Sequence, residues 1–244
     1  MLARDNDDAF RIIGTYVDAP LTWAISAGAS SPVSDVGELR GGRIGVSRMG
    51  SGSHIMSIVL AQQRGWLASD GAVGQSVAAP RAEPFDFVIL GDFAGLRDGV
   101  NADKADAFMW ETFTSKPFHD GGVIKRVGQI TTPWPAFMLA ARTQMIGERA
   151  DEVRRLGDAV SEACGVFMQE RDTGKSQEYV ASTFAQRPED VEEWFKTVKY
   201  AGDVRNVSIA VLEQCVRTLQ EANVVTGNVN VADLIDKSVV VQCE

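Results

Sequence analysis

Cysteine and histidine are scarce in this 244-residue sequence, and their scarcity argues against two common kinds of site. The three cysteines show no Cys-x-x-Cys spacing, and the only histidines are His54 and His119. We therefore expect no disulfide framework, no zinc site and no other bound metal. Cys164 and Cys215 lie on apolar helical stripes, which predicts buried, reduced thiols at both positions.

Basic residues and long apolar runs are scarce as well. Lys and Arg total 24 against 33 Asp and Glu, a net charge of -9 that repels nucleic-acid phosphates and anionic membrane surfaces. The longest stretch without a polar residue is residues 134–141, whereas a membrane helix needs about 20 apolar residues. We therefore expect neither a nucleic-acid partner nor membrane insertion. The first residues lack the apolar core of a secretory signal, which predicts a cytoplasmic location.

The rest of the composition is that of a folded globular protein, with 45% hydrophobic residues. Up to residue 142, short apolar segments alternate with helical patterns, which predicts an α/β fold. The predicted strands are residues 11–26, 43–47, 73–79, 85–90, 105–110 and 123–130, and the predicted helices are residues 54–65 and 92–100. Two proline-marked extended segments bracket this region. The first is broken by a bend at Pro20, and the second covers residues 132–141.

Beyond Arg142 the pattern is helical almost to the end of the sequence. One apolar stripe that we expect to be buried consists of Val153, Leu156, Val160, Cys164 and Phe167. Further stripes follow within residues 191–198 and 211–219, and the one strand candidate is the weak segment 239–241.

The strongest local signal lies between Ile44 and His54, where a buried strand ends in a glycine and serine loop that opens a helix. Such a loop leaves backbone N–H groups and the positive end of the helix dipole available to an anionic or polar ligand. The ligand-binding residues predicted here are Ser47, Arg48, Gly50, Ser51, Gly52, Ser53 and His54. On this segment alone, simple capping of the helix by Ser51 or Ser53 is an equally good interpretation.

Catalytic motifs do not account for this loop. The dinucleotide-binding pattern requires a third glycine where the chain has Ile55, and residues 50–54 do not supply the Gly-x-Ser-x-Gly order of a nucleophile elbow. Ser53 and His54 do not form a catalytic pair, because consecutive helical residues point about 100° apart. His54 is therefore predicted to line or cap the site, and we assign no catalytic residue and no cofactor.

A second constellation follows the strand that ends at Trp110 and Glu111, with Thr114, Ser115 and Lys116 in a predicted loop beyond it. Ligands of open α/β sheets lie outside the carboxyl ends of the strands, so Glu111 is a candidate acceptor of a ligand hydrogen bond and Trp110 a candidate apolar wall. An ordinary surface ion pair of Glu111 is an equal alternative.

Two further tryptophans stand beside the proline-marked segments. Trp23 follows Pro20, and Trp134 lies between two prolines. Both are candidates to line the same cleft, although a tryptophan beside a proline is more often a packing residue.

Four segments together resemble the type 2 periplasmic-binding-protein fold, in the branch of alkanesulfonate, taurine and thiamine-pyrimidine-precursor binders. They are Gly14–Ile25, Gly42–His54, Asp106–Glu111 and Thr132–Pro135. The likeness is greatest to the fungal, intracellular members and extends from about residue 10 to at least residue 200.

The resemblance implies two α/β lobes joined by two crossover strands, with the ligand in the cleft between the lobes. Lobe I is then residues 1–30 plus 133–244 and is mainly helical, and lobe II is residues 31–132. The family fold opens with strands and helices that precede the first crossover. The first lobe is therefore expected to be truncated at its N-terminus.

Three functions follow from this resemblance. The favoured one is a small-molecule binding protein for a polar or anionic metabolite such as a sulfonate or a pyrimidine. The second is an enzyme similar to thiamine-pyrimidine-precursor synthases, which the lack of a cysteine cluster disfavours. The third is a remnant that does not bind ligand, and the incomplete lobe leaves a homodimer open, since an uncovered sheet edge favours pairing.

Overall fold

The computed structural model describes residues 9–67, 84–221 and 224–243. The chain forms two compact units, of which unit 1 is Met1–Leu21, Thr132–Thr218 and Val225–Glu244, and unit 2 is Thr22–Thr131 and Leu219–Val224. The chain therefore passes between the units at residues 21–22 and 131–132, and again at residues 218–219 and 224–225. That residues 1–30 plus 133–244 and residues 31–132 act as ligand-closing lobes stays a prediction.

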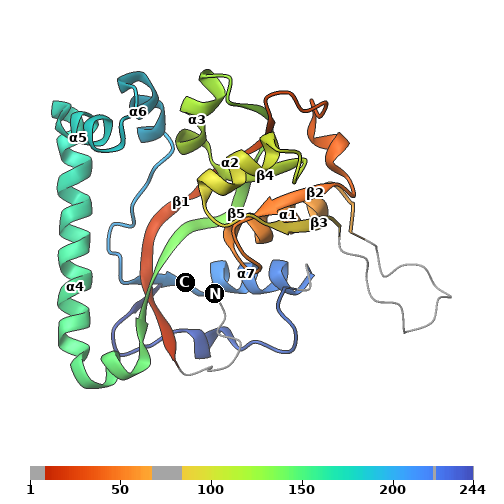
Figure 1. Cartoon of the computed structure of the whole chain (residues 1–244). Coiled ribbons are helices and arrows are strands. Elements are labelled where there is room, and N and C mark those ends of the chain that lie inside the picture. The colour runs from red at the N-terminus through yellow and green to blue at the C-terminus, as the bar shows by residue number, and fades with distance from the viewer. Residues whose placement is uncertain (1–8, 68–83, 222–223, 244) are drawn as a thin grey trace. The chain divides into compact units, whose positions relative to one another are not determined.

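A mixed five-stranded sheet in the order β3-β2-β4-β1-β5 organises unit 2 (Figure 1). Its strands are β1 (Phe10–Gly28), β2 (Arg43–Val46), β3 (Asp86–Ile89), β4 (Ala107–Glu111) and β5 (Ile124–Arg142). β2 pairs in parallel with both β3 and β4, and β1 pairs antiparallel with β4 from Trp23 to Ser26. The predicted α/β fold is confirmed.

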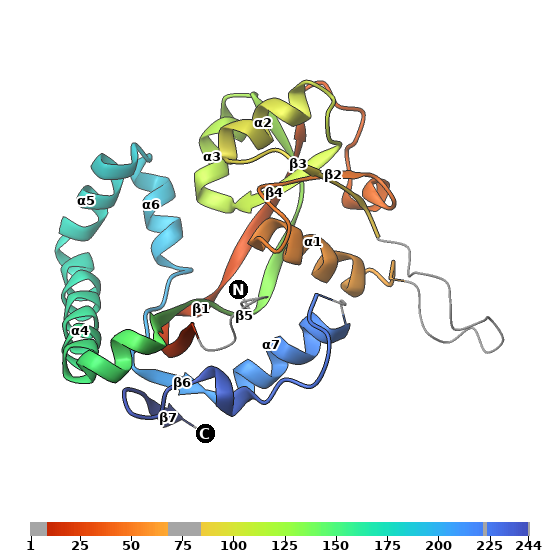
Figure 2. The ribbon, with the colours of Figure 1, turned by 60° about the horizontal axis from the view of Figure 1, so that its bottom comes forward.

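One helix follows each parallel strand. The helices are α1 (Gly52–Gln63), α2 (Phe93–Asn101) and α3 (Thr112–Asp120), and a short 3-10 helix covers Val36–Leu39. Figure 2 shows α1 on one side of the parallel strands and α2 and α3 on the other. The strands and helices predicted between residues 43 and 110 are confirmed, except the strand at 73–79, which lies outside the described residues.

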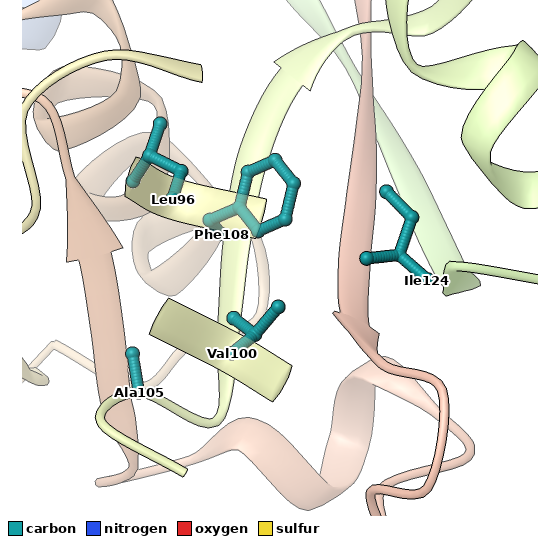
Figure 3. Close-up of a cluster of buried hydrophobic side chains, with 5 residues drawn as sticks. All are labelled: Leu96, Val100, Ala105, Phe108 and Ile124. Atoms are coloured by element: carbon teal, nitrogen blue, oxygen red, sulfur yellow. The ribbon is translucent and has the colours of Figure 1, made fainter. Parts of the chain in front are cut away.

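The core on the α2 and α3 side of the sheet is built around Phe108, whose side chain is fully buried. Successive strand residues point to opposite faces, so Phe108 and Trp110 share the face that Met109 does not. Figure 3 shows the cluster, which consists of Leu96, Val100, Ala105, Phe108 and Ile124. This packing fixes β4 and hence the position of the residues that follow it.

Unit 1 combines the outer lengths of β1 and β5 with most of the C-terminal helices. Its elements are α4 (Thr143–Glu170), α5 (Lys175–Phe184), α6 (Pro188–Phe195), β6 (Asn206–Ser208), α7 (Ile209–Glu221) and β7 (Val241–Cys243), with 3-10 helices at Arg171–Thr173 and Val231–Leu234. Three buried apolar clusters hold these elements together, and they centre on Val153, Val191 and Leu212. The predicted helical character beyond residue 142 is confirmed.

The prolines interrupt neither long strand, so the predicted break at Pro20 is wrong. β1 runs continuously through Pro20. Pro20 lies outside the ladder with β4, so no N–H is needed from it there. β5 likewise joins two segments that were predicted separately, and it passes through Pro133 and Pro135. β5 is the terminal strand of the sheet, so one of its edges is unpaired. Residues two apart direct their nitrogens to the same edge, so this unpaired edge tolerates both Pro133 and Pro135.

Three further expectations need correction. Thr114, Ser115 and Lys116 lie in α3 rather than in a loop, because the carboxylate of Glu111 caps the helix start. The strand β6 falls where no strand was predicted, since its three residues are too few to show a pattern. Leu156 of the expected buried stripe is 62% exposed. No helix within the described parts of the chain is long and apolar enough to cross a membrane.

Candidate functional site

The carboxyl ends of β2, β3 and β4 lie at one edge of the sheet, because the three strands are parallel. The chain leaves β2 for β3 on one side and returns to β4 on the other, so its direction of winding reverses between β2 and β4. Ligands of open α/β sheets bind at such a switch point, outside the strand ends. In unit 2 this position falls between the starts of α1 and α3.

Two of the three helix starts at this edge carry their own negative charge. Asp92 caps α2, and its Oδ1 accepts a hydrogen bond of 2.9 Å from the Gly95 N–H. Glu111 caps α3, with 2.9 Å from the Phe113 N–H to Oε1 and 2.7 Å from the Thr114 N–H to Oε2. Each carboxylate offsets the positive end of the helix dipole behind it. These two helix starts are therefore poorly suited to a second anion.

The start of α1 differs, because its cap is neutral. Ser51 Oγ accepts from the His54 N–H at 3.4 Å, and the Ser51 N–H donates to the Arg48 carbonyl at 3.2 Å. The N–H groups of Gly52 and Ser53, the first two residues of the helix, have no partner among the described residues. Two backbone donors and an uncompensated dipole therefore meet at the start of α1, which is the arrangement that binds anions.

The serine hydroxyls of the loop are linked to one another. Ser53 Oγ accepts from the Ser47 N–H at 3.2 Å and lies 3.0 Å from Ser51 Oγ. One hydroxyl hydrogen of this pair forms the Ser51–Ser53 bond, and the other has no partner among the described residues. The predicted capping and ligand-binding roles of Ser51 are thus compatible, because a capping hydroxyl still has a hydrogen to donate.

Trp23 lies against the start of α1, as its position in the sheet requires. The β1–β4 register sets Trp23 opposite Glu111, and a Cβ added to Gly52 would lie 2.7 Å from Cη2 of the indole. The indole Nε1 is buried and has no hydrogen-bond partner in the described parts of the chain. Trp23 therefore lies where sequence reasoning predicted a ligand contact, and it explains why residue 52 has no side chain.

His54 supports the loop from inside. Its side chain is buried, Nδ1 accepts from the Gly50 N–H at 3.2 Å, and its ring meets Phe87 edge-on with 4.6 Å between ring centroids. An accepting Nδ1 places the ring proton on Nε2. Gly50 has a φ of 74°, a conformation that favours glycine. Arg48, two residues before Gly50, is exposed at the rim of the loop.

Trp110 is not brought together with these residues. It packs on the α2 side of the sheet, with its ring centroid 5.6 Å from that of Phe93, while Trp23 and Glu111 stand on the α1 side. Trp134 belongs to unit 1, where its carbonyl accepts from the Thr132 hydroxyl. Within unit 2, therefore, the structure gathers the loop residues, Trp23 and Glu111.

An ion cluster that was not predicted from the sequence lies at the opposite edge of the sheet, where β2 begins. Arg43 contacts carboxylate oxygens of Asp103 and Asp106 at 2.6 Å each, and it also donates to the Asp103 carbonyl. Burial alone would raise the pKa of Asp106, but the hydrogen bonds from Arg43 outweigh it and lower that pKa. Asp103 has a φ of 55°, and its contacts with Arg43 hold this unusual conformation. The cluster is structural.

Both described cysteine side chains are free thiols. Burial raises the pKa of Cys164 and raises that of Cys215 to about 11, so both stay protonated at neutral pH. Cys164 is buried as predicted, whereas Cys215 is only half-buried. Across the described residues, no group of three His, Cys, Asp or Glu side chains is placed to hold a metal ion.

A phosphate-loop tripeptide, Gly174-Lys-Ser176, does occur at the start of α5. The full pattern requires a first glycine at position 169, where the chain has Gln169, and an open hydroxyl after the lysine. The Ser176 hydroxyl instead donates to the Phe167 carbonyl at 2.5 Å and is buried. This segment joins two helices and is not a phosphate loop.

The two-unit α/β arrangement of this chain is that of the periplasmic-binding-protein fold, as the solved structures similar to it show. Residues 23–130 match the family model described as Ca3427-like PBP. The Candida albicans CA3427 gene product, described as defining a new family with this fold, is 31% identical over 94% of this chain and 73% of its own, with a TM-score of 0.78. This chain belongs to the Ca3427-like family, which confirms the resemblance.

More distant structures share the fold. The alkanesulfonate-binding protein SsuA from Xanthomonas axonopodis, bound to MOPS, is 16% identical over 96% of this chain and 74% of its own, with a TM-score of 0.60. The desulfurization enzyme DSZB is 14% identical over 98% of this chain and 80% of its own, with a TM-score of 0.56. A comparison with curated proteins gave no match. At these identities, the likeness of the last two structures concerns the fold alone.

Proposed function

We propose that this protein binds a small anionic metabolite, and that the start of α1 in unit 2 holds the anionic group. The observation that carries the proposal is the contrast among the three helix starts at the switch-point edge. Asp92 and Glu111 neutralise α2 and α3, whereas α1 has a serine cap and two N–H donors that no described residue pairs with. An anion is therefore stabilised at α1 and disfavoured at its neighbours.

The relatives support a solute-binding role. The Candida relative has the periplasmic-binding-protein fold, and SsuA is an alkanesulfonate-binding protein. A sulfonate offers three oxygens to the Gly52 and Ser53 N–H groups and to the spare hydroxyl hydrogen of the Ser51–Ser53 pair. The indole of Trp23 offers an apolar surface for the remainder of the ligand. A carboxylate, or a ring-bearing anion such as an acidic pyrimidine, likewise presents negatively charged oxygens to these donors.

The test is calorimetric titration of the purified chain with methanesulfonate, taurine, orotate and acetate. At least one of these anions is expected to bind, and Ser51→Ala is expected to weaken its binding about tenfold through the lost hydroxyl donor. Asn230→Ala is the matched control, because it also removes a helix cap, from the Ala232 N–H, but within unit 1. Absence of binding by every anion would refute the proposal, and so would unchanged affinity in Ser51→Ala.

Pairing of two copies and a cytoplasmic location also stay proposals. Sedimentation of the chain over a hundredfold range of concentration tests the first, and a rising mass is the expected sign of a dimer. No particular arrangement of side chains described above favours an enzyme, and the fold likeness to DSZB does not carry its activity to this chain.

A further inference from the structure

From Val153 onward, α4 carries two apolar stripes rather than one. The inner stripe includes Val153 and Cys164, which are buried against the rest of unit 1. A second stripe consists of Leu156, Ala159, Ala163 and Val166, which all lie on one helix face by their spacing. Leu156 is 62% exposed and Val166 48%. A helix that is apolar on two faces is normally covered on both, so the outer stripe is a candidate interaction surface.

A groove between α4 and α5 continues this outer stripe. It has a volume of about 470 Å³ and is lined by Ala159, Glu162, Ala163, Val166, Phe167, Glu170, Ser176 and Tyr179. Tyr179 forms the α5 wall and is 60% exposed. Figure 1 shows α5 next to the C-terminal end of α4. We call the outer stripe and this groove together the α4–α5 trough.

The charges of the trough are all negative. Glu162 stands within the stripe and has no ion pair or hydrogen bond with any described residue. Glu170 is approached by Lys175, but at 3.5 Å and with both side chains largely exposed. No Lys or Arg lines the groove. An occupant that brings apolar side chains with a positive charge beside them would therefore match both the surface and its charge.

We propose that the α4–α5 trough docks an amphipathic helix of a partner polypeptide that carries Lys or Arg beside its apolar stripe. A helix suits the trough better than a small ligand, because the exposed stripe from Leu156 to Val166 extends about 15 Å along α4. The small side chains of Ala159 and Ala163 leave room for a second helix to lie close. The positive charges of the partner would meet Glu162 and Glu170.

The test uses the full chain and a fluorescein-labelled peptide of about 18 residues, made of leucine and lysine in helical amphipathic order. Fluorescence anisotropy is expected to show binding of this peptide, with about tenfold weaker binding of a leucine and glutamate peptide of the same order. Val166→Ser combined with Tyr179→Ser is expected to weaken the leucine and lysine peptide about tenfold. Phe137→Ser, at an exposed position of β5, is the apolar control and should leave binding unchanged.

Charge is tested separately by Glu162→Gln, which is expected to weaken binding about threefold and to reduce its salt dependence. Glu192→Gln, an exposed glutamate of α6, is the matched control and should change neither. All variants alter exposed side chains, and unchanged melting temperatures would show that they fold. The proposal is overturned if the trough variants bind the peptide like wild type. It is also overturned if the wild type is a dimer that Val166→Ser dissociates, since a second copy would then be the occupant.

Discussion

Gly52 is constrained by a neighbouring side chain rather than by its own backbone. An added Cβ would lie 2.7 Å from Cη2 of Trp23, so Gly52→Ala must displace the indole. We expect the free energy of unfolding to fall by about 1–2 kcal/mol, as in other overpacked sites. Urea denaturation measures this change. Gly165→Ala on α4, where nothing lies within 4 Å, should instead stabilise the chain by about 0.5–1 kcal/mol. Equal effects of the two substitutions would contradict the close contact.

His119 gives the stability a pH dependence. Burial, and then the charge of Arg126, lower its pKa below the ordinary value of 6.5, and its Nε2 lies 3.0 Å from Ser26 Oγ. Below pH 6.5 the unfolded chain therefore binds this proton before the folded chain does. The free energy of unfolding falls as the pH drops through this window and levels off once the folded form is also protonated.

The variant His119→Gln lacks this contribution. Urea denaturation between pH 7.5 and pH 5 should therefore show a steeper loss of stability for wild type than for His119→Gln. Above pH 7 the two proteins should change in parallel, since the imidazole is neutral in both states. Parallel curves across the whole range would show that His119 does not have a lowered pKa.

At the scale of single residues, the sequence predicted a ligand-binding loop from Ser47 to His54 but not the hydrogen-bond partners of each side chain. Serine is a preferred capping residue, so the sequence predicted a capping role for Ser51 as well as a ligand-binding role. Glu111 was not foreseen as a cap, since glutamate is uncommon there. Trp110 was grouped with Trp23, because nothing in a single strand shows which of its two faces meets which helix.

The helix starts of unit 2 differ in charge, and α3 offers the clearest test of that difference. Glu111 supplies both of its carboxylate oxygens to the N–H groups of α3, so Glu111→Ala should cost about 1–2 kcal/mol of stability. Anion affinity should not fall, because the residue lost is a cap with a negative charge and not a donor to the ligand. Chemical denaturation and calorimetry measure the two quantities.

Glu192→Ala is the control for this substitution, since Glu192 is an exposed glutamate outside any cap and should change stability by less than about 0.5 kcal/mol. A large loss of anion affinity in Glu111→Ala would favour the ligand contact that the sequence predicted.

At the scale of elements, periodicity found most strands and helices, and it failed where another principle decided. Proline suggested a break in β1 and a separate segment in β5, yet each proline lies where its missing N–H is not needed. Thr114, Ser115 and Lys116 were predicted to lie in a loop after the strand, and the cap by Glu111 places them in α3 instead. The three-residue β6 was too short to be recognised.

At the scale of the whole molecule, two adjacent threonines lie where the chain passes from unit 2 to unit 1, and their surroundings differ. Thr132 is buried, and its Oγ1 accepts from the Leu21 N–H at 2.9 Å and donates to the Trp134 carbonyl. Thr131 is exposed, and its hydroxyl lies 3.0 Å from the Thr22 hydroxyl. The two positions thus form a natural pair for substitution.

We expect Thr132→Val to lower the free energy of unfolding by about 1–2 kcal/mol, because it leaves the partly buried Leu21 N–H without its acceptor. Thr131→Val should change it by less than about 0.5 kcal/mol. Thermal and urea unfolding of both variants measure the difference, and a larger effect at Thr131 would contradict the hydrogen bonds at this crossing.

The way the chain is divided between the units has a consequence for its synthesis. Unit 2 is almost one continuous stretch, residues 22–131, whereas unit 1 needs residues from both sides of it. Residues 10–21 of β1 are synthesised well before two of their partners, Tyr200 and Ile235, which bridge to Val17 and Ile12. This part of β1 therefore waits while unit 2 and most of unit 1 are synthesised, a period when nascent strands are most open to mispairing.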